Sequence, residues 1–292
     1  MFESIFNDLK RTLKQGDTLV WLIGANALVF AVFGLTHVVL LLSMHPEFWN
    51  ILEEQMRLPA NRHLVLGRPW TVFTYMFYHQ SVMHLLGNLL FLYWFGQIYQ
   101  LYMNSNKLAL VYLLGGVVGA AVFVISYNVL PVFHVAVAGS TLIGASAGVM
   151  AVMFAAAALN PDHEIHILGI FTVPIKYVVG VLLLLDIISI SNGNAGGYLA
   201  HCGGALAGWL VVQQLRSGRN IFKPIEKAGA MISFGKSGPR VSHVSDKKTK
   251  VISKTEEEQR QVDDILDKIS RSGYNSLSKH EKEVLFQFGK KN

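Results

Sequence analysis

The chain has 292 residues, 52% hydrophobic and 15% charged, with a formal net charge of +6. A soluble globular domain has about a quarter of its residues charged, so this composition argues against an ordinary soluble enzyme and predicts a membrane protein. The single cysteine, Cys202, excludes an internal disulfide. Of the 25 Lys and Arg, 16 lie in residues 217–292, together with 10 of the 19 Asp and Glu. The last quarter of the chain is therefore expected to be a soluble tail.

The first 16 residues carry an amphipathic pattern. Lys10, Arg11 and Lys14 lie off a helically spaced apolar stripe, which is made of Phe2, Ile5, Phe6, Leu9 and Leu13. This pattern predicts a helix over residues 1–16 that lies on the membrane surface.

Six long runs with little or no charge follow, at residues 18–43, 82–103, 108–130, 144–159, 169–190 and 196–215. Backbone polar groups in lipid must be paired within the segment, and these runs do not show the alternation of a barrel strand. We therefore expect an all-α membrane protein whose core, residues 17–216, is a bundle of six transmembrane helices.

The fourth run is unusually short. Its 16 residues form about 24 Å of helix, against a hydrocarbon core of about 30 Å. Asn160-Pro161-Asp162 is a polar stop at its inner end, so its outer end is expected to start below the outer surface. Irregular backbone at that depth is tolerated inside protein or beside a water-filled cavity. Ser146 is thus expected at a submerged helix N-terminus that faces such a cavity.

Basic residues predict the orientation. They precede the first run, occur as Lys107 between the second and third runs, and follow the sixth. Six crossings place all three positions on one side, which the excess of positive charge identifies as the cytoplasm. Both termini are then cytoplasmic.

The tail is predicted to have two parts. Residues 217–255 are rich in Gly, Ser and Lys and are expected to form a flexible linker. Residues 256–292 are expected to form a small cytosolic helical hairpin, with Ser278 and Glu281 as a capping box at the start of its second helix. Neither its partner nor its function is evident from its residues.

Polar residues gather early in the second, fourth and sixth runs, which all begin on the outer side: His84 and Asn88, then Ser146, then His201. Each lies within roughly 3–12 Å of the outer end of its helix. A serine needs a neighbouring base to act as a nucleophile, and an imidazole titrates near neutral pH. This shared depth predicts Ser146 as nucleophile and His201 as general base.

The neighbouring residues suit the same chemistry. His84 and Asn88 are four residues apart, so they share one helix face and can donate to one oxygen. With the backbone N–H of Ser146 they would form an oxyanion hole. Gly204 and Gly208 leave a bare surface on the sixth helix, where another helix can approach closely.

The same residues allow other interpretations. Gly-x-Ser-x-Gly in a membrane helix is commonly a packing motif, and His84 with Asn88 can serve as hydrogen-bonding residues without catalysis; neither predicts all four side chains at one depth. Asp186 is expected to face the bundle or the interface rather than to join Ser146 and His201 as a third member. No metal site is predicted, because the sequence His163-Glu164-Ile165-His166 is one residue short of a zinc-protease motif and lies in a loop.

Three motifs resemble those of the rhomboid intramembrane serine proteases, over residues 68–215: His84-x-x-x-Asn88, Gly144-x-Ser146-x-Gly148 and Ala200-His201-x-x-Gly204-x-x-x-Gly208. The resemblance implies a six-helix bundle with a Ser146–His201 dyad and an oxyanion site at His84 and Asn88. It also places His79 at the mouth of the cavity that Gly144 lines. Substrates would be single-span membrane proteins.

Two positions depart from the family pattern. Trp70 is followed by Thr71 instead of the usual arginine, which puts the anchoring of the first connection in doubt. Gln100 replaces a common glutamate, which is expected to loosen the inner end of the second helix.

The tail resembles a helical module of rhomboids from Bacteroidetes-type bacteria, which implies a bacterial inner membrane location. The predicted function is an intramembrane serine endopeptidase without cofactor or metal, whose partners are the lipid bilayer and membrane-protein substrates rather than nucleic acid. The alternatives are a catalytically silent rhomboid-like binder of membrane helices and a transporter. A transporter is disfavoured because the runs show no hydropathy repeat and contain one acidic residue.

Overall fold

The computed structural model describes residues 17–167, 171–191, 193–219 and, in the tail, 265, 268–269, 276–278 and 280–284. The chain divides into two compact units, Met1–Ala228 and Gly229–Asn292. The surface helix expected over residues 1–16 lies outside the described residues, as does the predicted linker beyond residue 219.

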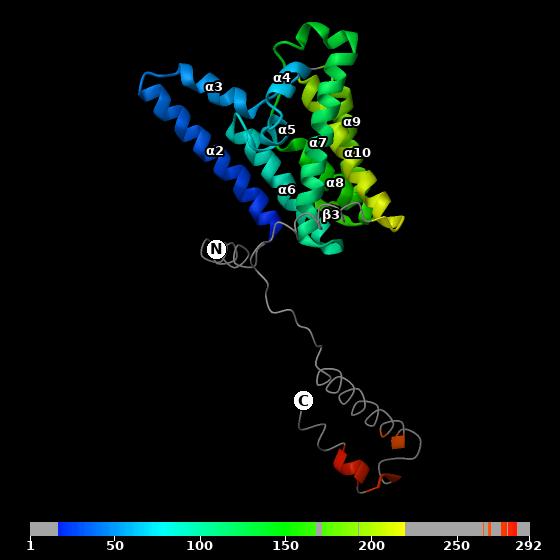
Figure 1. Cartoon of the computed structure of the whole chain (residues 1–292). Coiled ribbons are helices and arrows are strands. Elements are labelled where there is room, and N and C mark those ends of the chain that lie inside the picture. The colour runs from blue at the N-terminus through cyan, green and yellow to red at the C-terminus, as the bar shows by residue number, and fades with distance from the viewer. Residues whose placement is uncertain are drawn as a thin grey trace. The chain divides into compact units, whose positions relative to one another are not determined.

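Each of the six predicted runs overlaps a helix of the first unit (Figure 1): α2 (Thr18–Leu42), α6 (Val82–Tyr102), α7 (Ser105–Val129), α8 (Ser146–Leu159), α9 (Ile175–Ser189) and α10 (Ala195–Arg216). The predicted start of the fifth helix at residue 169 is wrong. Phe171–Pro174 forms strand β4, which pairs antiparallel with β3 (Glu164–Ile167), and α9 begins only after Pro174. Glu164–His166 therefore lies in a strand instead of the expected loop, whereas His163 lies just before the strand.

The other connections contain short elements: α3 (Glu47–Met56), β1 (Leu58–Pro59), α4 (Arg62–Gly67), α5 (Thr71–Thr74), η1 (Tyr75–Phe77), η2 (Pro131–Ala136) and β2 (Thr141–Leu142). β1 and β2 pair antiparallel. The expected all-α fold is thus largely helical, with two short strand pairs added. The β1–β2 pair ties the first connection to the residues just before α8.

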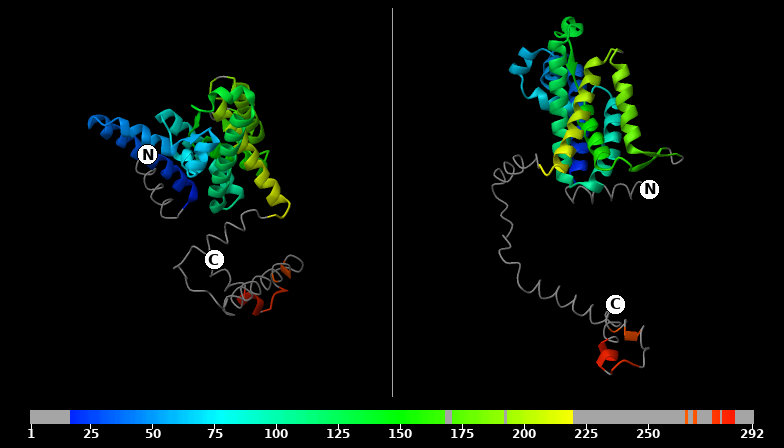
Figure 2. Two further views of the ribbon diagram at one scale, coloured as in Figure 1. Left: turned by 45° about the horizontal axis from the view of Figure 1, so that its top comes forward. Right: turned by 90° about the vertical axis from the view of Figure 1, so that its right-hand side faces the viewer.

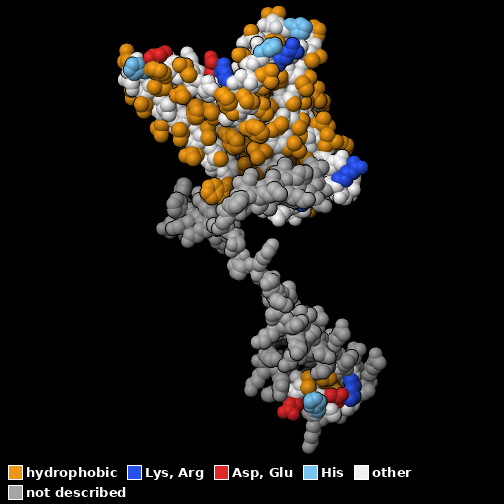
Figure 3. All heavy atoms as spheres, in the orientation of Figure 1, with side chains coloured by type: hydrophobic (Ala, Val, Ile, Leu, Met, Phe, Trp, Pro, Cys, Tyr) orange, Lys and Arg blue, Asp and Glu red, His pale blue; other side chains and the backbone are white. Residues whose placement is uncertain are grey.

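Three helices are long and apolar enough to cross a membrane in the described part of the chain: α2, α7 and α10. α8 and α9 have 14 and 15 residues, fewer than the roughly 20 that a perpendicular span needs. α6 has 21 residues, but it includes polar residues such as His84, Asn88 and Gln100. Hydrophobic side chains cover the sides of the first unit (Figure 3), and α2 leans away from the other helices (Figure 2). The chain is a membrane protein.

The short helix α8 lies at the centre of the bundle, packed against α6, α7 and α10. Eleven of its 14 residues are buried. A Cβ added at Gly204 would lie 2.0 Å from the carbonyl oxygen of Ala147, and one at Gly208 would lie 2.0 Å from that of Ala151. The close approach predicted from these two glycines is confirmed.

Polar contacts define one end of the bundle. Asp17 Oδ1 accepts hydrogen bonds from Gln100 Nε2 (2.6 Å) and Ser105 Oγ (2.9 Å), so α2 and α7 begin where α6 ends. Asn160 Nδ2 donates to Tyr102 Oη (2.8 Å), which brings the end of α8 to the same place. Gln100 therefore links helices at this end of the bundle. The sequence had instead suggested that this residue would loosen the inner end of α6. The starts of α6 and α8 must lie at the opposite end.

The first connection is also anchored. Arg68 Nη1 donates to the carbonyl oxygen (3.0 Å) and the carboxylate (3.1 Å) of Glu54. Trp70 Nε1 donates to the carbonyl oxygen of Gln55 (3.2 Å). Arg68 and Trp70 thus hold α3 from two positions, although Trp70 is not followed by arginine.

In the second unit the predicted capping box is confirmed. The backbone N–H of Ser278 donates to Glu281 Oε2 (2.7 Å), and the N–H of Glu281 donates to Ser278 Oγ (3.3 Å). Lys268 Nζ also donates to Glu281 Oε1 (2.8 Å). These hydrogen bonds, that from Lys268 first, lower the pKa of the Glu281 carboxyl from 4.5 to about 2.

We expect Gly204→Ala to lower the stability of the first unit by about 1–3 kcal/mol, because the new Cβ must displace the backbone of α8. Thermal unfolding in detergent measures the loss. Gly180→Ala on α9 is the matched control, since no atom lies within 4 Å of its added Cβ. Equal unfolding temperatures for the two variants would contradict the packing described for Gly204.

We expect Ser278→Ala to reduce hydrogen-exchange protection of residues 280–284 about five-fold, the effect of losing a typical N-cap. Because the pKa of Glu281 is lowered by these bonds, the protection should persist above pH 4.5 and decline as the pH falls toward 2. His280→Ala, which leaves both capping bonds in place, should keep the protection of the unchanged chain. Exchange measured on the full-length protein by mass spectrometry tests this.

Candidate functional site

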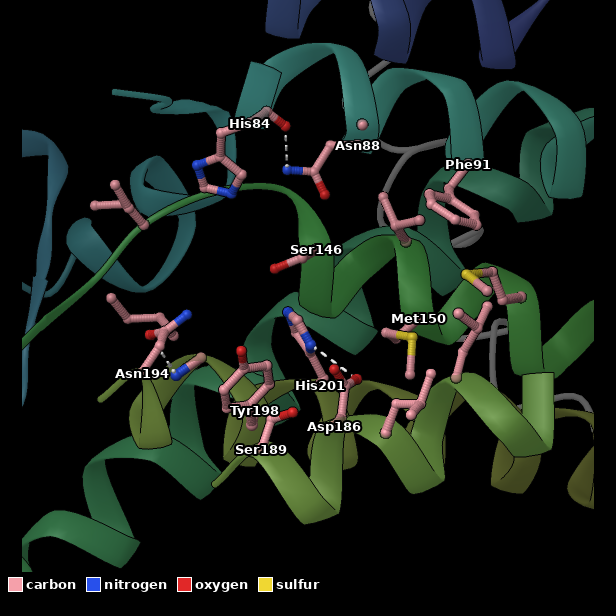
Figure 4. A pocket seen from close by; sticks show the side chains of 18 of the residues that line it. His84, Asn88, Phe91, Ser146, Met150, Asp186, Ser189, Asn194, Tyr198 and His201 are labelled. Atoms are coloured by element: carbon pink, nitrogen blue, oxygen red, sulfur yellow. Dashed lines mark hydrogen bonds and ion pairs between the residues drawn. The ribbon is translucent and has the colours of Figure 1, made fainter. Parts of the chain in front are cut away.

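A cavity of about 820 Å³ lies among α6, α8, α9 and α10. Polar side chains from all four helices line it (Figure 4), namely His84, Asn88, Ser146, Asp186, Ser189, Tyr198 and His201. Asn194, the N-cap of α10, and Gln80 and Thr141 from the connections complete its polar lining. The structure therefore brings together the four side chains that the sequence placed at one depth.

Ser146 is the first residue of α8, and the turn before it determines where its side chain points. Gly144 has φ of +98°, a conformation that only glycine adopts readily. A Cβ there would also lie 2.6 Å from Cε1 of His84. The N–H of Gly144 donates to the carbonyl oxygen of Tyr75 (2.8 Å). This turn starts α8 at the cavity, with Ser146 half-buried in its wall.

The start of α8 is also suited to hold negative charge. The first N–H groups of a helix have no acceptor within the helix, and its N-terminus carries a partial positive charge. The N–H of Ser146 is among these groups. An oxyanion beside Ser146 would meet a donor that needs no rearrangement.

His201 comes from α10 and faces the same cavity. Its ring lies edge-on to Tyr198, with centroids 6.1 Å apart and an angle of 86° between the planes. Figure 4 shows one ring nitrogen toward Asp186 and the other on the side of Ser146. In the part of the chain that the structure describes, no hydrogen bond joins Ser146 to His201; catalytic hydrogen bonds are often long without substrate.

Asp186 faces the bundle, one of the two positions expected for it, and it contacts His201, which the sequence did not predict. Its Oδ2 atom lies 3.0 Å from Nδ1 of His201. The reason is physical: a carboxylate on the apolar helix α9 is costly unless it is paired and hydrogen-bonded. Among the residues that line the cavity, His201 supplies that partner.

His79 lies behind the cavity rather than at its mouth. It is buried, and its Nε2 accepts from the N–H of Ala145 (3.3 Å) and from Asn88 Nδ2 (3.2 Å). A backbone N–H can only donate, so Nε2 is the unprotonated nitrogen, and Nδ1 carries the hydrogen that points to the carbonyl oxygen of Phe77 (3.3 Å). Neither His79 nor Gly144 is among the lining residues; both support the turn that starts α8.

Asn88 has its amide engaged. Its Nδ2 donates to His79 and also to the carbonyl oxygen of His84 (3.0 Å). An amide nitrogen has two hydrogens, so both are used within the protein. The Asn88 amide was expected to be free to bind an oxyanion, and it is not. The His84 ring, in contrast, faces the cavity.

Sequence reasoning missed polar residues at the cavity, among them Ser189, Asn194 and Tyr198. Tyr198 precedes His201 by three positions, so helical spacing places both on one face; that spacing was the available signal. Asn194 caps α10, with its Oδ1 accepting from the N–H of Gly197 (3.3 Å). A Cβ at Gly197 would lie 2.6 Å from Nδ2 of Asn194, so the glycine leaves room for the cap.

The chain matches two protein families. Residues 66–217 match the Rhomboid domain, and residues 249–291 match a family of unknown function, DUF6576. The second match covers most of the predicted hairpin and assigns it no role.

A curated relative is similar over much of the chain. RHOMBOID-like protein 12, mitochondrial, from Arabidopsis thaliana is 25% identical over 223 residues, which cover 71% of this chain and 61% of the relative. The chain thus spans about three fifths of the length of that relative. The Rhomboid match covers more than half of the chain and includes α6 to α10, the helices that build the cavity. This chain is a member of the rhomboid family.

Proposed function

We propose that this protein is an intramembrane serine endopeptidase that cleaves single-span membrane proteins, with Ser146 as nucleophile and His201 as general base. One observation carries the proposal. Ser146, at the N-terminus of the central helix, and His201, from a neighbouring helix, line one cavity of about 820 Å³ inside an apolar bundle.

The proposed reaction follows from these positions. Ser146 Oγ attacks the carbonyl carbon of the scissile peptide bond while His201 Nε2 takes its proton. The proton then passes to the leaving amine as the C–N bond breaks, which leaves an acyl-enzyme. Water, deprotonated by His201, attacks the ester; the acid product leaves and the proton returns to Ser146. The residues suffice for this acyl transfer without a metal or cofactor.

The proposed oxyanion site uses the backbone N–H of Ser146 and the ring of His84. For Asn88 to donate to the oxyanion as well, its amide must exchange the bond to His79 for one to the substrate. Donors placed where negative charge develops contribute about 3 kcal/mol each in well-studied sites. His79 supports this arrangement indirectly, because it binds both Asn88 and the turn before Ser146.

We also propose six membrane crossings, with both termini on the cytoplasmic side of a bacterial inner membrane. The support is the presence of six helices with few charged residues and the clustering of basic residues at the matching ends. The 14 residues of α8 give about 21 Å of helix, so its start at the cavity would lie below the outer surface. Substrate helices would then reach Ser146 from within the membrane.

The proposed topology predicts where reporter fusions are active. Alkaline phosphatase fused after residue 135 should be active outside the cytoplasm, whereas fusions after residues 104 and 219 should be inactive. A green fluorescent protein fused at the same positions should show the reverse pattern. The same activity at all three positions would contradict six crossings.

We expect Ser146→Ala and His201→Ala to abolish cleavage of a membrane substrate with a helix-destabilised segment, by at least about 10³-fold. Ser43→Ala, which removes a hydroxyl at the end of α2 away from the cavity, should keep the wild-type rate. The assay follows product formation by the purified protein in detergent, with and without a chelator, which should have no effect. Cleavage that survives Ser146→Ala would refute the mechanism.

A fluorophosphonate probe offers a test that needs no substrate. The probe should label the unchanged protein and fail to label Ser146→Ala, because it reacts with activated serines. A folded protein that is never labelled would instead support the catalytically silent binder of membrane helices.

A further inference from the structure

We propose that Asp186 is a positioning residue for His201, so that the site operates as a Ser146–His201–Asp186 triad. This inference rests on the proposed function. It departs from the two-residue arrangement that the family motifs imply, since those motifs include no residue of α9.

The contact determines which nitrogen of His201 carries the hydrogen. Asp186 Oδ2 lies 3.0 Å from Nδ1, and an ionised carboxylate can only accept. Neutral His201 must therefore hold its hydrogen on Nδ1, which leaves a lone pair on Nε2. Nε2 is the atom on the side of Ser146 (Figure 4), so the carboxylate selects the tautomer that can take the serine proton.

The contact also restricts the ring. His201 and Asp186 are on different helices, α10 and α9, and their side chains are only 18% and 17% exposed. A hydrogen bond between two partly buried side chains on separate helices limits rotation of the imidazole about its side-chain bonds. The direction of Nε2 is thus held without any contact from Ser146 itself.

The charge of Asp186 suits the reaction. His201 becomes an imidazolium when it takes the proton from Ser146, and a nearby carboxylate stabilises that cation more strongly in a desolvated site than in water. Among the described residues, the other titratable side chains near His201 are His84 on α6 and Tyr198 on α10, and Cys202, the next residue of α10, interacts with Asp186. None of these side chains is a carboxylate. Asp186 is the single carboxylate among the residues that line the cavity.

A purely structural role is the competing explanation. The Asp186–His201 contact could join α9 to α10 without influencing the chemistry. That explanation predicts a less stable α9 when Asp186 is replaced, but it predicts neither a change of the His201 tautomer nor a selective loss of kcat.

The experiment uses the full-length protein in detergent with Asp186→Asn, Asp186→Ala and Leu184→Ala. The leucine is on the same helix, more than half exposed on the outer side and away from the cavity, so it controls for disturbance of α9. We expect both Asp186 variants to lower kcat by about 100-fold or more, by analogy with other triads. KM should change less than about two-fold, because the proposed role of Asp186 is to act on His201 during the reaction and not to bind the substrate helix. Leu184→Ala should keep the wild-type kcat.

Nitrogen-15 NMR of histidine-labelled protein supplies a readout independent of cleavage. The spectra are recorded in the Ser146→Ala background, and His201→Gln identifies the His201 signals. With Asp186 present, His201 should show a protonated Nδ1 and an unprotonated Nε2; in Asp186→Ala the signals should move toward the Nε2-protonated form.

The outcomes separate the two proposals. An unchanged tautomer in Asp186→Ala, or a wild-type kcat, would overturn the role of Asp186. If the protein shows no Ser146-dependent cleavage, the proposed protease function fails, and the NMR result still decides whether Asp186 orients His201.

Discussion

The contact between α8 and α10 supports the rest of the structure. Backbone meets backbone where Gly204 and Gly208 face the carbonyl oxygens of Ala147 and Ala151, with no space for even one Cβ. In a membrane there is little hydrophobic driving force between helices, so this close packing is the main source of association. It places Ser146, one residue before Ala147, beside the helix that carries His201. The same contact therefore stabilises the bundle and assembles the site.

The polar side chains around the cavity have separate roles. His79 receives hydrogen bonds from Asn88 and from the N–H of Ala145, which secures the turn at Gly144 from behind. The face of the cavity is left to Ser146, His84 and His201. Unpaired polar groups are costly inside an apolar bundle, and the Asn88 amide and the Ala145 N–H beside the site both have His79 as a partner. Support and reactivity are thus carried by different side chains.

The Rhomboid match over residues 66–217 spans α6 to α10, but the three motifs that predicted the site include neither Asp186 nor the tail. Asp186 lies on α9, a helix at the rim of the bundle (Figure 2), where its only partner among the described residues is His201. The tail has its own capped helix and its own family match.

The sequence by itself determined the helices and the candidate catalytic residues, because both are recognised from local patterns. Long uncharged runs predicted the helices, and the early positions of His84, Ser146 and His201 predicted that they would meet. The sequence did not reveal the β3–β4 pair or the late start of α9, because strand pairing depends on residues outside the local run. Asp186 was assigned to the bundle or the interface because one carboxylate in a helix carries no information about its partner. Only the tertiary structure decided that α9 brings it to His201, and that the amide of Asn88 is bound to His79, because both contacts depend on how separate helices are placed in space.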